Sequence, residues 1–307
     1  MSPEGFGPEG SGEPRRGAPV SGRQGGAPIN LELDWPVERG GVAVVSAAGV
    51  DAAYLGGVTG SDEFRVASVT QLLTTMAALA AVDGGRLDLD QPVPAAGEGV
   101  TVRHLLAHAA GLPFETSGGH RPPEQRRIYS NLGFRVLADA VAAAAGTSFE
   151  AWLAGSVLGP LGMAATRLSS RRGVAADPAA GAVSTLDDLV RLAGCLLDRG
   201  APLVAAGLFA EATSVQFPGL AGLVPGVGRF DPCDWGLGFE LHDRKRPHWM
   251  GDRRSGAAFG HFGASGCFLW VDPEARLACA AVTDRDFADD RWGMATWPAW
   301  SDRLPAA

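Results

Sequence analysis

The stretch Phe64-Arg-Val-Ala-Ser68-Val-Thr-Gln71 stands at the start of a strongly patterned segment. Apolar residues then recur at three- and four-residue spacing as far as Asp83, and the pair Gly84-Gly85 is typical of a helix end. The pattern predicts a helix over 68–83, with Ser68 in its first turn and Gln71 on roughly the same face. A hydroxyl in that turn lies near unpaired backbone N–H groups and the positive end of the helix dipole, which favour negative charge developing nearby.

Strand-like segments lie near both ends of the chain. Residues 41–49 and 52–58 predict a hairpin with its turn at Gly49-Val-Asp51, and a second hairpin follows from 266–271 and 277–283 around the turn at 272–275. The middle of the chain predicts helices over 132–145, 148–157 and 186–197, the last of them preceded by the N-cap pattern Thr185-x-x-Asp188. Strands from distant segments with helices between them imply one sheet assembled from both chain ends.

Composition excludes several function classes. A chain of 307 residues with 46% hydrophobic and 20% charged residues predicts one large globular unit or two closely joined ones. A net charge of -8 argues against a nucleic-acid partner. The four cysteines lack C-x-x-C spacing, which favours buried free thiols, and we find neither a membrane-length apolar run nor a secretory signal, so we expect a cytoplasmic protein. Residues 1–28 are rich in Gly, Pro and Ser and predict a disordered tail.

Three short motifs occur in an informative order. Phe64-Arg-Val-Ala-Ser68-Val-Thr resembles the nucleophile motif of the serine β-lactamase and penicillin-binding-protein superfamily, Tyr129-Ser130-Asn131 resembles its Y-x-N motif, and His261-Phe-Gly263 resembles the H-x-G variant of its third motif. Weaker matches, such as Trp235-Gly-Leu-Gly-Phe239, lie between them. The resemblance covers roughly residues 38–285 and is greatest to the branch that holds class C β-lactamases, D-aminopeptidases and carboxylesterases.

The resemblance implies an α/β (α+β) fold, with an antiparallel sheet flanked by helices. We expect the sheet region at 38–87 and 200–307, an all-helical subdomain at about 88–200, and the whole of 29–307 as one hydrolase domain. The tryptophans Trp292, Trp297 and Trp300 should lie on a carboxy-terminal helix that packs on the sheet.

The resemblance also implies acyl-enzyme chemistry on a small ester or amide, in which Ser68 attacks the carbonyl. The backbone N–H groups of Ser68 and Ala264 would form the oxyanion hole, while Gln71, Asn131 and Gly263 would contact substrate. No cofactor or metal is implied, and the oligomeric state is not predicted.

The first motif departs from the family at its fourth position, where S-x-x-K becomes Ser68-Val-Thr-Gln71. A glutamine donates hydrogen bonds but cannot carry a proton, and an unassisted phenol is a poor base at neutral pH. We therefore expect a catalytic set of Ser68, Tyr129 and His261 with reduced activity, in which the imidazole compensates for the lost lysine. The alternatives are acyl transfer to a metabolite, or an inactive relative that binds a ligand or partner in the cleft.

Each motif residue also has a purely structural interpretation. Ser68 and Asn131 could be helix caps, Tyr129 a buried aromatic and His261 a structural histidine. We expect His104 and His108 only to pack or hydrogen-bond. Five further side chains lack metal-ligand spacing and predict no metal site: Asp231, Asp234, His242, His248 and Asp252. The Gly263-Ala-Ser265-Gly-Cys267 stretch lacks the last glycine of a G-x-S-x-G nucleophile elbow.

Overall fold

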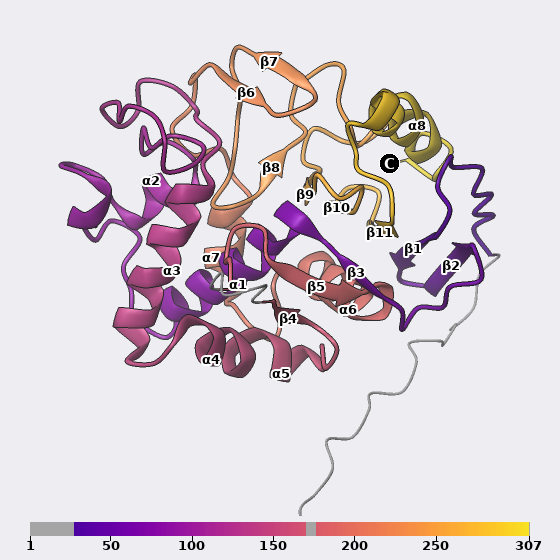
Figure 1. The fold of residues 1–307 in the computed structure, drawn as a ribbon, viewed down its shortest axis with the longest axis horizontal. Coiled ribbons are helices and arrows are strands. Elements are labelled where there is room, and N and C mark those ends of the chain that lie inside the picture. Colours follow the sequence, from indigo (N-terminus) through magenta and orange to yellow (C-terminus); the bar gives the residue numbers. More distant parts are fainter. Residues whose placement is uncertain (1–27, 170–175, 307) are drawn as a thin grey trace, which may run out of the picture.

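A six-stranded antiparallel sheet carries the fold, and its strands come from both ends of the chain (Figure 1). The computed structural model describes residues 28–169 and 176–306, so the tail predicted over 1–28 lies outside the described residues except for its last position. The strand order is β2-β1-β11-β10-β9-β8. The bounds are β1 (Gly40–Ser46), β2 (Gly49–Leu55), β8 (Glu240–Leu241), β9 (Phe259–Phe262), β10 (Phe268–Asp272) and β11 (Leu277–Thr283).

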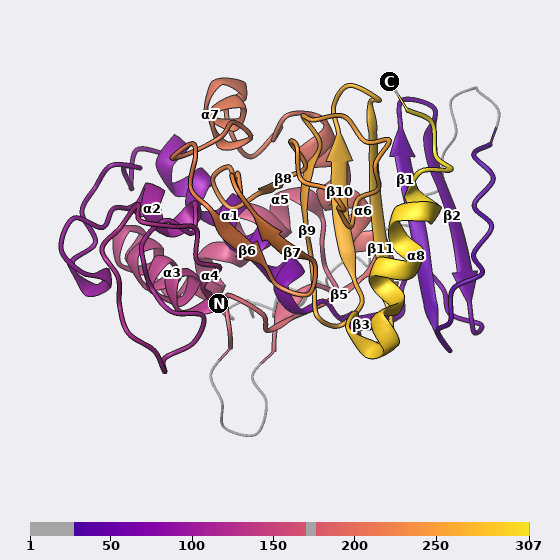
Figure 2. The same cartoon turned by 90° about the horizontal axis from the view of Figure 1, so that it is seen from above.

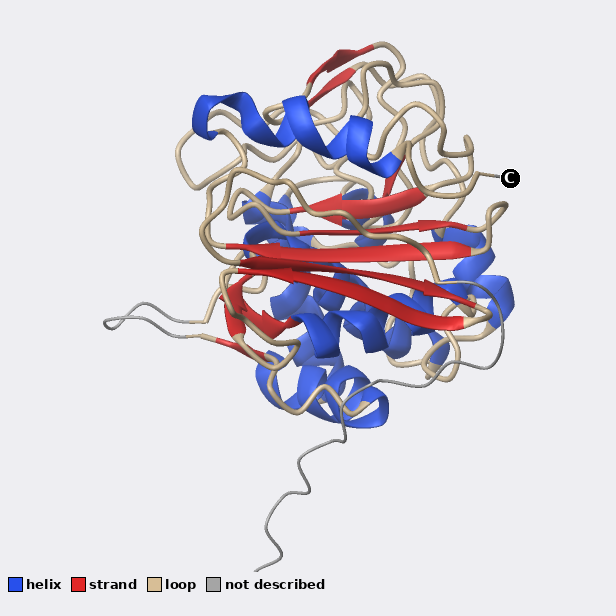
Figure 3. Cartoon of the chain, turned by 90° about the vertical axis from the view of Figure 1, so that its right-hand side faces the viewer, coloured by secondary structure: helices blue, strands red, loops and turns tan. Residues whose placement is uncertain are grey.

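Both faces of this sheet are covered, which explains why its central strands β10 and β11 are buried throughout and mostly apolar (Figure 3). On β10, Leu269 and Val271 join the core shared with the helices, whereas Phe268 and Trp270 pack on the other side. That other side is closed by α8 (Trp292–Ser301), whose three tryptophans are buried, as the sequence predicts. Each face thus has its own apolar core, set by the two-residue period of a strand.

The remaining helices occupy the other face of the sheet and one end of the molecule (Figure 2). Their bounds are α1 (Thr70–Asp83), α2 (Val102–Leu106), α3 (Asn131–Ala145), α4 (Phe149–Leu153), α5 (Gly159–Leu161), α6 (Leu186–Leu197) and α7 (Ala206–Ala212). Short helical turns are η1 (Ala67–Val69), η2 (Pro94–Ala96), η3 (Ala154–Leu158) and η4 (Asp289–Arg291). Two small sheets complete the fold, one from β3 (Glu63–Arg65), β5 (Ala182–Thr185) and β4 (Arg167–Leu168), the other from β6 (Gly222–Val224) and β7 (Gly228–Phe230).

The predicted fold class is confirmed, with local differences. The first hairpin turns at 47–48 and not at Gly49-Val-Asp51, because Val50 and Asp51 already pair with β1. The segment 88–200 also differs from the all-helical expectation: it contains β4 and β5, and α6 packs against β1, β10 and β11. Thr185 caps α6 by accepting a hydrogen bond from the Asp188 backbone N–H at 3.1 Å, as predicted. In the described ranges no single helix is long and apolar enough to cross a membrane, although two helices bent by 77° reach that length when counted together.

Candidate active site

Ser68 lies in the tight turn η1, where β9 packs against the start of α1. The preceding residue, Ala67, has a φ of +44°, a left-handed conformation that non-glycine residues rarely adopt. Gly263 presses against this turn so closely that a Cβ there would lie 2.3 Å from the Val66 carbonyl oxygen and 3.2 Å from the Ser68 nitrogen. The glycine of the H-x-G motif is therefore required by backbone contact, and the strained turn fixes the serine.

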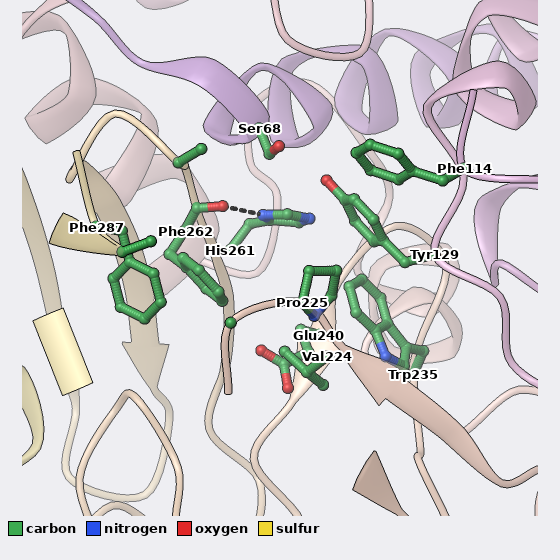
Figure 4. A pocket seen from close by; sticks show the side chains of 13 residues that line it. Ser68, Phe114, Tyr129, Val224, Pro225, Trp235, Glu240, His261, Phe262 and Phe287 are labelled. Atoms are coloured by element: carbon green, nitrogen blue, oxygen red, sulfur yellow. Dashed lines mark hydrogen bonds between the residues drawn. The ribbon is translucent and has the colours of Figure 1, made fainter. Parts of the chain in front are cut away.

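A cavity of about 230 Å³ opens beside Ser68 and brings four of the seven predicted site residues together. Ser68, Tyr129 and His261 line it (Figure 4), and so does Ala264. Gln71, Asn131 and Gly263, which were predicted to contact substrate, are not among its lining residues. The rest of its wall is mostly apolar, formed by Phe114, Val224, Pro225, Trp235, Phe262 and Phe287. In Figure 4 the His261 ring lies below Ser68 and beside the Tyr129 ring, whose hydroxyl points toward Ser68.

Two backbone donors face no acceptor at this site. Within residues 28–169 and 176–306, the N–H groups of Ser68 and Ala264 donate to no protein oxygen. The loop that carries Ala264 is held by its neighbours, because the Gly263 N–H donates to the Cys267 carbonyl at 2.8 Å and the Ala264 carbonyl accepts from the Phe287 N–H at 2.8 Å. Unused donors on a rigid loop and a strained turn are the parts from which an oxyanion hole is built.

Gln71, three residues after Ser68, is fully buried. Its Nε2 donates to the Tyr129 hydroxyl at 2.6 Å and to Asn131 Oδ1 at 3.1 Å. Its Oε1 has no hydrogen-bond partner among the described residues. Since Gln71 donates to Tyr129, the phenolic oxygen is an acceptor in this contact and its own hydrogen remains available for another group.

The direction of the Gln71 amide is set by a chain of side chains behind it. Asn131 Nδ2 donates to Glu115 Oε1 at 2.8 Å, and the other Glu115 oxygen pairs with Arg135. Burial would raise the pKa of Glu115, but the bonds from Arg135 and Asn131 outweigh it and lower that pKa, so the group remains a carboxylate that can only accept. Asn131 Oδ1 must then face Gln71, and the Gln71 amide must donate to it through Nε2. Ser130, not Asn131, is the N-cap of α3 and accepts from the Gly133 N–H at 2.9 Å.

Burial gives Tyr129 and His261 opposite pKa shifts, both of which favour the neutral form. The pKa of Tyr129 is raised by burial, an effect that hydrogen bonds from Ser68 and Gln71 reduce only in part. Burial lowers the pKa of His261 to about 4. The His261 Nδ1 lies 2.7 Å from the Phe262 carbonyl oxygen, to which it can only donate, which leaves Nε2 as the unprotonated nitrogen. That Nε2 is buried and has no partner in the described part of the chain.

Glu240 lines the same cavity but is committed to a buried ion pair. It lies 2.8 Å from Lys245 Nζ and 3.0 Å from His248 Nε2, and it also accepts from Trp249 Nε1. Burial alone would raise its pKa, but the charges of Lys245 and His248 hold that pKa well below the usual range. Glu240 is therefore a fixed carboxylate whose charge is already neutralised.

His104 and His108 pack and form hydrogen bonds, as the sequence predicts. His104 lies 3.0 Å from Glu124, and the His108 ring packs 4.7 Å from the Tyr129 ring, with Nδ1 accepting from the Ser130 N–H. His248 is bound to Glu240, and His242 Nε2 bonds to the Gly251 carbonyl at 2.7 Å. No cluster of possible metal ligands occurs in the portion of the chain that the structure covers.

Comparison with known proteins places this geometry in a family. The Beta-lactamase family profile matches residues 36–297. A crystal structure described as a β-lactamase from Mycobacterium bovis is 46% identical, covers 87% of this chain and 94% of its own, and superposes with a TM-score of 0.79. The chain belongs to the β-lactamase family. The octameric penicillin-binding protein homologue from Pyrococcus abyssi covers 84% of this chain and 72% of its own at a TM-score of 0.67, but at 20% identity it shows the fold alone.

Curated relatives match over a shorter stretch. The D-alanyl-D-alanine-carboxypeptidase/endopeptidase AmpH of Escherichia coli K12 is 31% identical over 134 residues, which are 32% of this chain and 35% of that protein. The match thus spans about a third of the length of the E. coli protein. Family members include serine hydrolases, and a hydrolase is what the grouping of Ser68, Tyr129 and His261 supports.

The residues that surround the motifs carry no signal in the sequence. Glu115 and Phe114 lie in an irregular loop, and Glu240 is in a two-residue strand, so neither periodicity nor spacing marks them. Trp235 stands out in the sequence only as part of a family match, whereas in the structure it lines the cavity. These residues become recognisable only when the loops are placed around Ser68.

Proposed function

We propose that this β-lactamase family member is a serine hydrolase that acts on a small ester or amide through an acyl-enzyme. The observation that carries the proposal is the shared cavity, which is lined by Ser68, by Ala264 and by a His261 whose Nε2 is unprotonated and unpartnered, with the backbone N–H groups of Ser68 and Ala264 uncommitted. In the proposed reaction His261 Nε2 takes the proton of Ser68 while Oγ attacks the carbonyl carbon.

The negative charge on the carbonyl oxygen would be held by the N–H groups of Ser68 and Ala264. Tyr129 would donate its hydroxyl hydrogen to the leaving oxygen or nitrogen as the bond to carbon breaks, and the His261 imidazolium would return a proton to Tyr129. Water would then hydrolyse the acyl-enzyme by the same route. The Gln71 bond to the Tyr129 oxygen supports this donor role, because it leaves the phenolic hydrogen free.

We further propose that Gln71 stands where the family places lysine and that turnover is reduced as a result. A lysine ammonium would lower the pKa of Tyr129, whereas Gln71 contributes only a neutral hydrogen bond. The mostly apolar wall of the cavity supports a small neutral acyl group. The four buried cysteines, none of them in a disulfide, support the proposal of a reducing, cytoplasmic location.

Labelling with a fluorophosphonate tests the proposal. We expect peptide mapping to find the label on Ser68 of the wild type and no label in Ser68→Ala, with slower labelling of the wild type than of Gln71→Lys. Label in Gln71→Lys but none in the wild type would identify an inactive relative. Absence of label from both proteins would refute a serine nucleophile at this position.

A further inference from the structure

A second cavity of about 440 Å³ adjoins the first and shares Phe114, Tyr129 and Pro225 with it. Its remaining wall consists of four arginines and two aliphatic side chains: Arg121, Arg126, Arg127, Arg229, Ile128 and Leu223. No aspartate or glutamate lines it in the described part of the chain. Such an arrangement is unusual for a protein with a net charge of -8, in which Asp and Glu outnumber Lys and Arg by 34 to 26.

Three of these arginines carry unpaired charge. Arg121, Arg126 and Arg229 are exposed, and none of them forms an ion pair or a side-chain hydrogen bond with any residue in 28–169 or 176–306. The nearby Glu124 is already bound to His104 at 3.0 Å. Guanidinium groups that protein carboxylates leave unpaired are the usual partners of carboxylate or phosphate groups on a ligand.

The fourth arginine holds the cavity in shape. Arg127 is buried and donates to four backbone carbonyls, those of Ala107 at 2.6 Å, Gln216 at 2.8 Å, Cys233 at 3.0 Å and Phe217 at 3.1 Å. Its backbone N–H also donates to the Ala221 carbonyl at 2.9 Å. These bonds join the loop that carries Arg121 and Arg126 to the β6–β7 hairpin.

Arg229 on that hairpin stands opposite Leu223 in the strand register. The arginine cluster is therefore built from two segments distant in sequence and locked together by a buried clamp.

The cavity also presents apolar surface. Phe114 and Leu223, which are 50% and 45% exposed, are the two most exposed large hydrophobic side chains in the described residues. An exposed ring and an aliphatic side chain beside unpaired guanidinium groups fit a ligand with an apolar body and an anionic end.

We propose that the arginine cavity binds an anionic group, a carboxylate or a phosphate, on the leaving-group side of the substrate. The inference rests on the proposed function. Tyr129 forms part of the wall of both cavities and, in the proposed reaction, faces the leaving oxygen, so a leaving group that passes Tyr129 reaches the arginines. The substrate class is then a small acyl ester of an anionic aryl or alkyl alcohol.

Three esters with the same acetyl group test the proposal: phenyl acetate, 3-acetoxybenzoate and 3-acetoxyphenyl phosphate. We expect kcat/KM to be higher for at least one anionic ester than for phenyl acetate, and the anionic ester that gains identifies carboxylate or phosphate as the group bound. Arg126→Gln and Arg229→Gln should each lower the ratio of anionic to neutral kcat/KM by about tenfold, the lower end for a charge-assisted hydrogen bond. Added salt should lower the same ratio.

Arg39→Gln provides a control with the same change of net charge, because Arg39 precedes β1 near the sheet edge opposite β8 and pairs with Asp62 on the surface. It should leave the ratio unchanged. Equal reduction of the ratio by Arg39→Gln and Arg229→Gln would overturn the proposal, as would equal kcat/KM for all three esters.

A binding measurement separates this inference from the proposed function. Titration calorimetry of the Ser68→Ala protein with 3-hydroxybenzoate, 3-hydroxyphenyl phosphate and phenol should show tighter binding of an anion than of phenol, and Arg229→Gln should remove the difference. Anion binding without ester turnover would support the anion site and refute the proposed hydrolase function. Turnover of phenyl acetate without anion binding would support the proposed hydrolase function and refute the anion site.

Discussion

The lowered pKa of His261 makes a sharp prediction about the pH dependence of the reaction. If His261 Nε2 is the base, the imidazole must remain mostly neutral as the pH is lowered, until the pH approaches its pKa of about 4. At pH 5 a histidine with that pKa is about 90% neutral, whereas one with the ordinary pKa of 6.5 is about 3% neutral, a difference of about thirtyfold in active enzyme. The expected kcat/KM is therefore constant from about pH 5 to 8 and falls only on approach to pH 4.

The assay is kcat/KM for phenyl acetate, or the rate of fluorophosphonate labelling, measured from pH 4 to 8 at constant ionic strength. His261→Asn keeps a polar side chain of similar size but removes the base, so it should be slower by about 100-fold or more at every pH. A wild-type acid limb centred between pH 6 and 7 would refute the reasoning about burial. Unchanged rates in His261→Asn would refute the role of the imidazole.

The same shift affects folding. The folded-state pKa of His261 lies below its unfolded value, so the unfolded chain binds more protons between about pH 4 and 6.5, and the stability of the native state rises with pH across that window. The full contribution is present above pH 6.5, and about 3 kcal/mol is lost by pH 4, since one pKa unit corresponds to about 1.4 kcal/mol. The thermal unfolding temperature of His261→Phe should therefore fall less steeply than that of the wild type as the pH drops from 6.5 to 4. Parallel pH dependences of the two proteins would contradict the shift.

Three further substitutions probe the buried groups. Gln71→Lys should raise the labelling rate of Ser68 by about 100-fold, because an ammonium lowers the pKa of Tyr129. The same variant should be less stable to urea, because the new charge is buried. Equal labelling rates in the two proteins would contradict the role given to Gln71. Glu115→Gln should lower kcat by about tenfold in the wild type but not in Gln71→Lys, since an ammonium has no amide direction to set, and a double-mutant cycle measures this coupling. Glu240→Gln leaves Lys245 as an uncompensated buried charge and should lower the free energy of unfolding in urea by about 3–5 kcal/mol. The double variant Glu240→Gln/Lys245→Met should recover part of that loss. Similar urea midpoints for the single and double variants would argue against the ion pair.

The sequence predicted the elements that have strong local patterns. The helix after Ser68, the α6 cap at Thr185 and the β10–β11 hairpin all occur where their patterns indicate, because each is decided by neighbouring residues. The first turn was misplaced since Gly49 suggested a loop, while cross-strand pairing extends β2 back to that residue. The short strands β6 and β7 contain glycines and carry no alternation that marks a strand.

The same distinction applies to the site. Ser68, Tyr129 and His261 could be proposed as site residues because the motifs are local, and the structure brings all three to one cavity. Their supporting residues were not predictable: Glu115 and Arg127 act through loops whose partners lie up to 106 residues away in the chain. Loop contacts of that kind depend on the assembled sheet and helices and not on any period in the sequence.

The sheet built from both chain ends has a consequence for how activity is acquired. Gly40 pairs with Thr283, so a contact between residues more than 200 positions apart holds the two ends of the chain side by side. Ser68 follows the early strands, whereas His261 and Ala264 come with the late ones, so the proposed active site is assembled only after this distant pairing has formed. Pairings of such long range are slow to form and cooperative. Recovery of Ser68 labelling after dilution from denaturant would therefore report closure of the whole sheet, whereas helical circular dichroism would recover earlier.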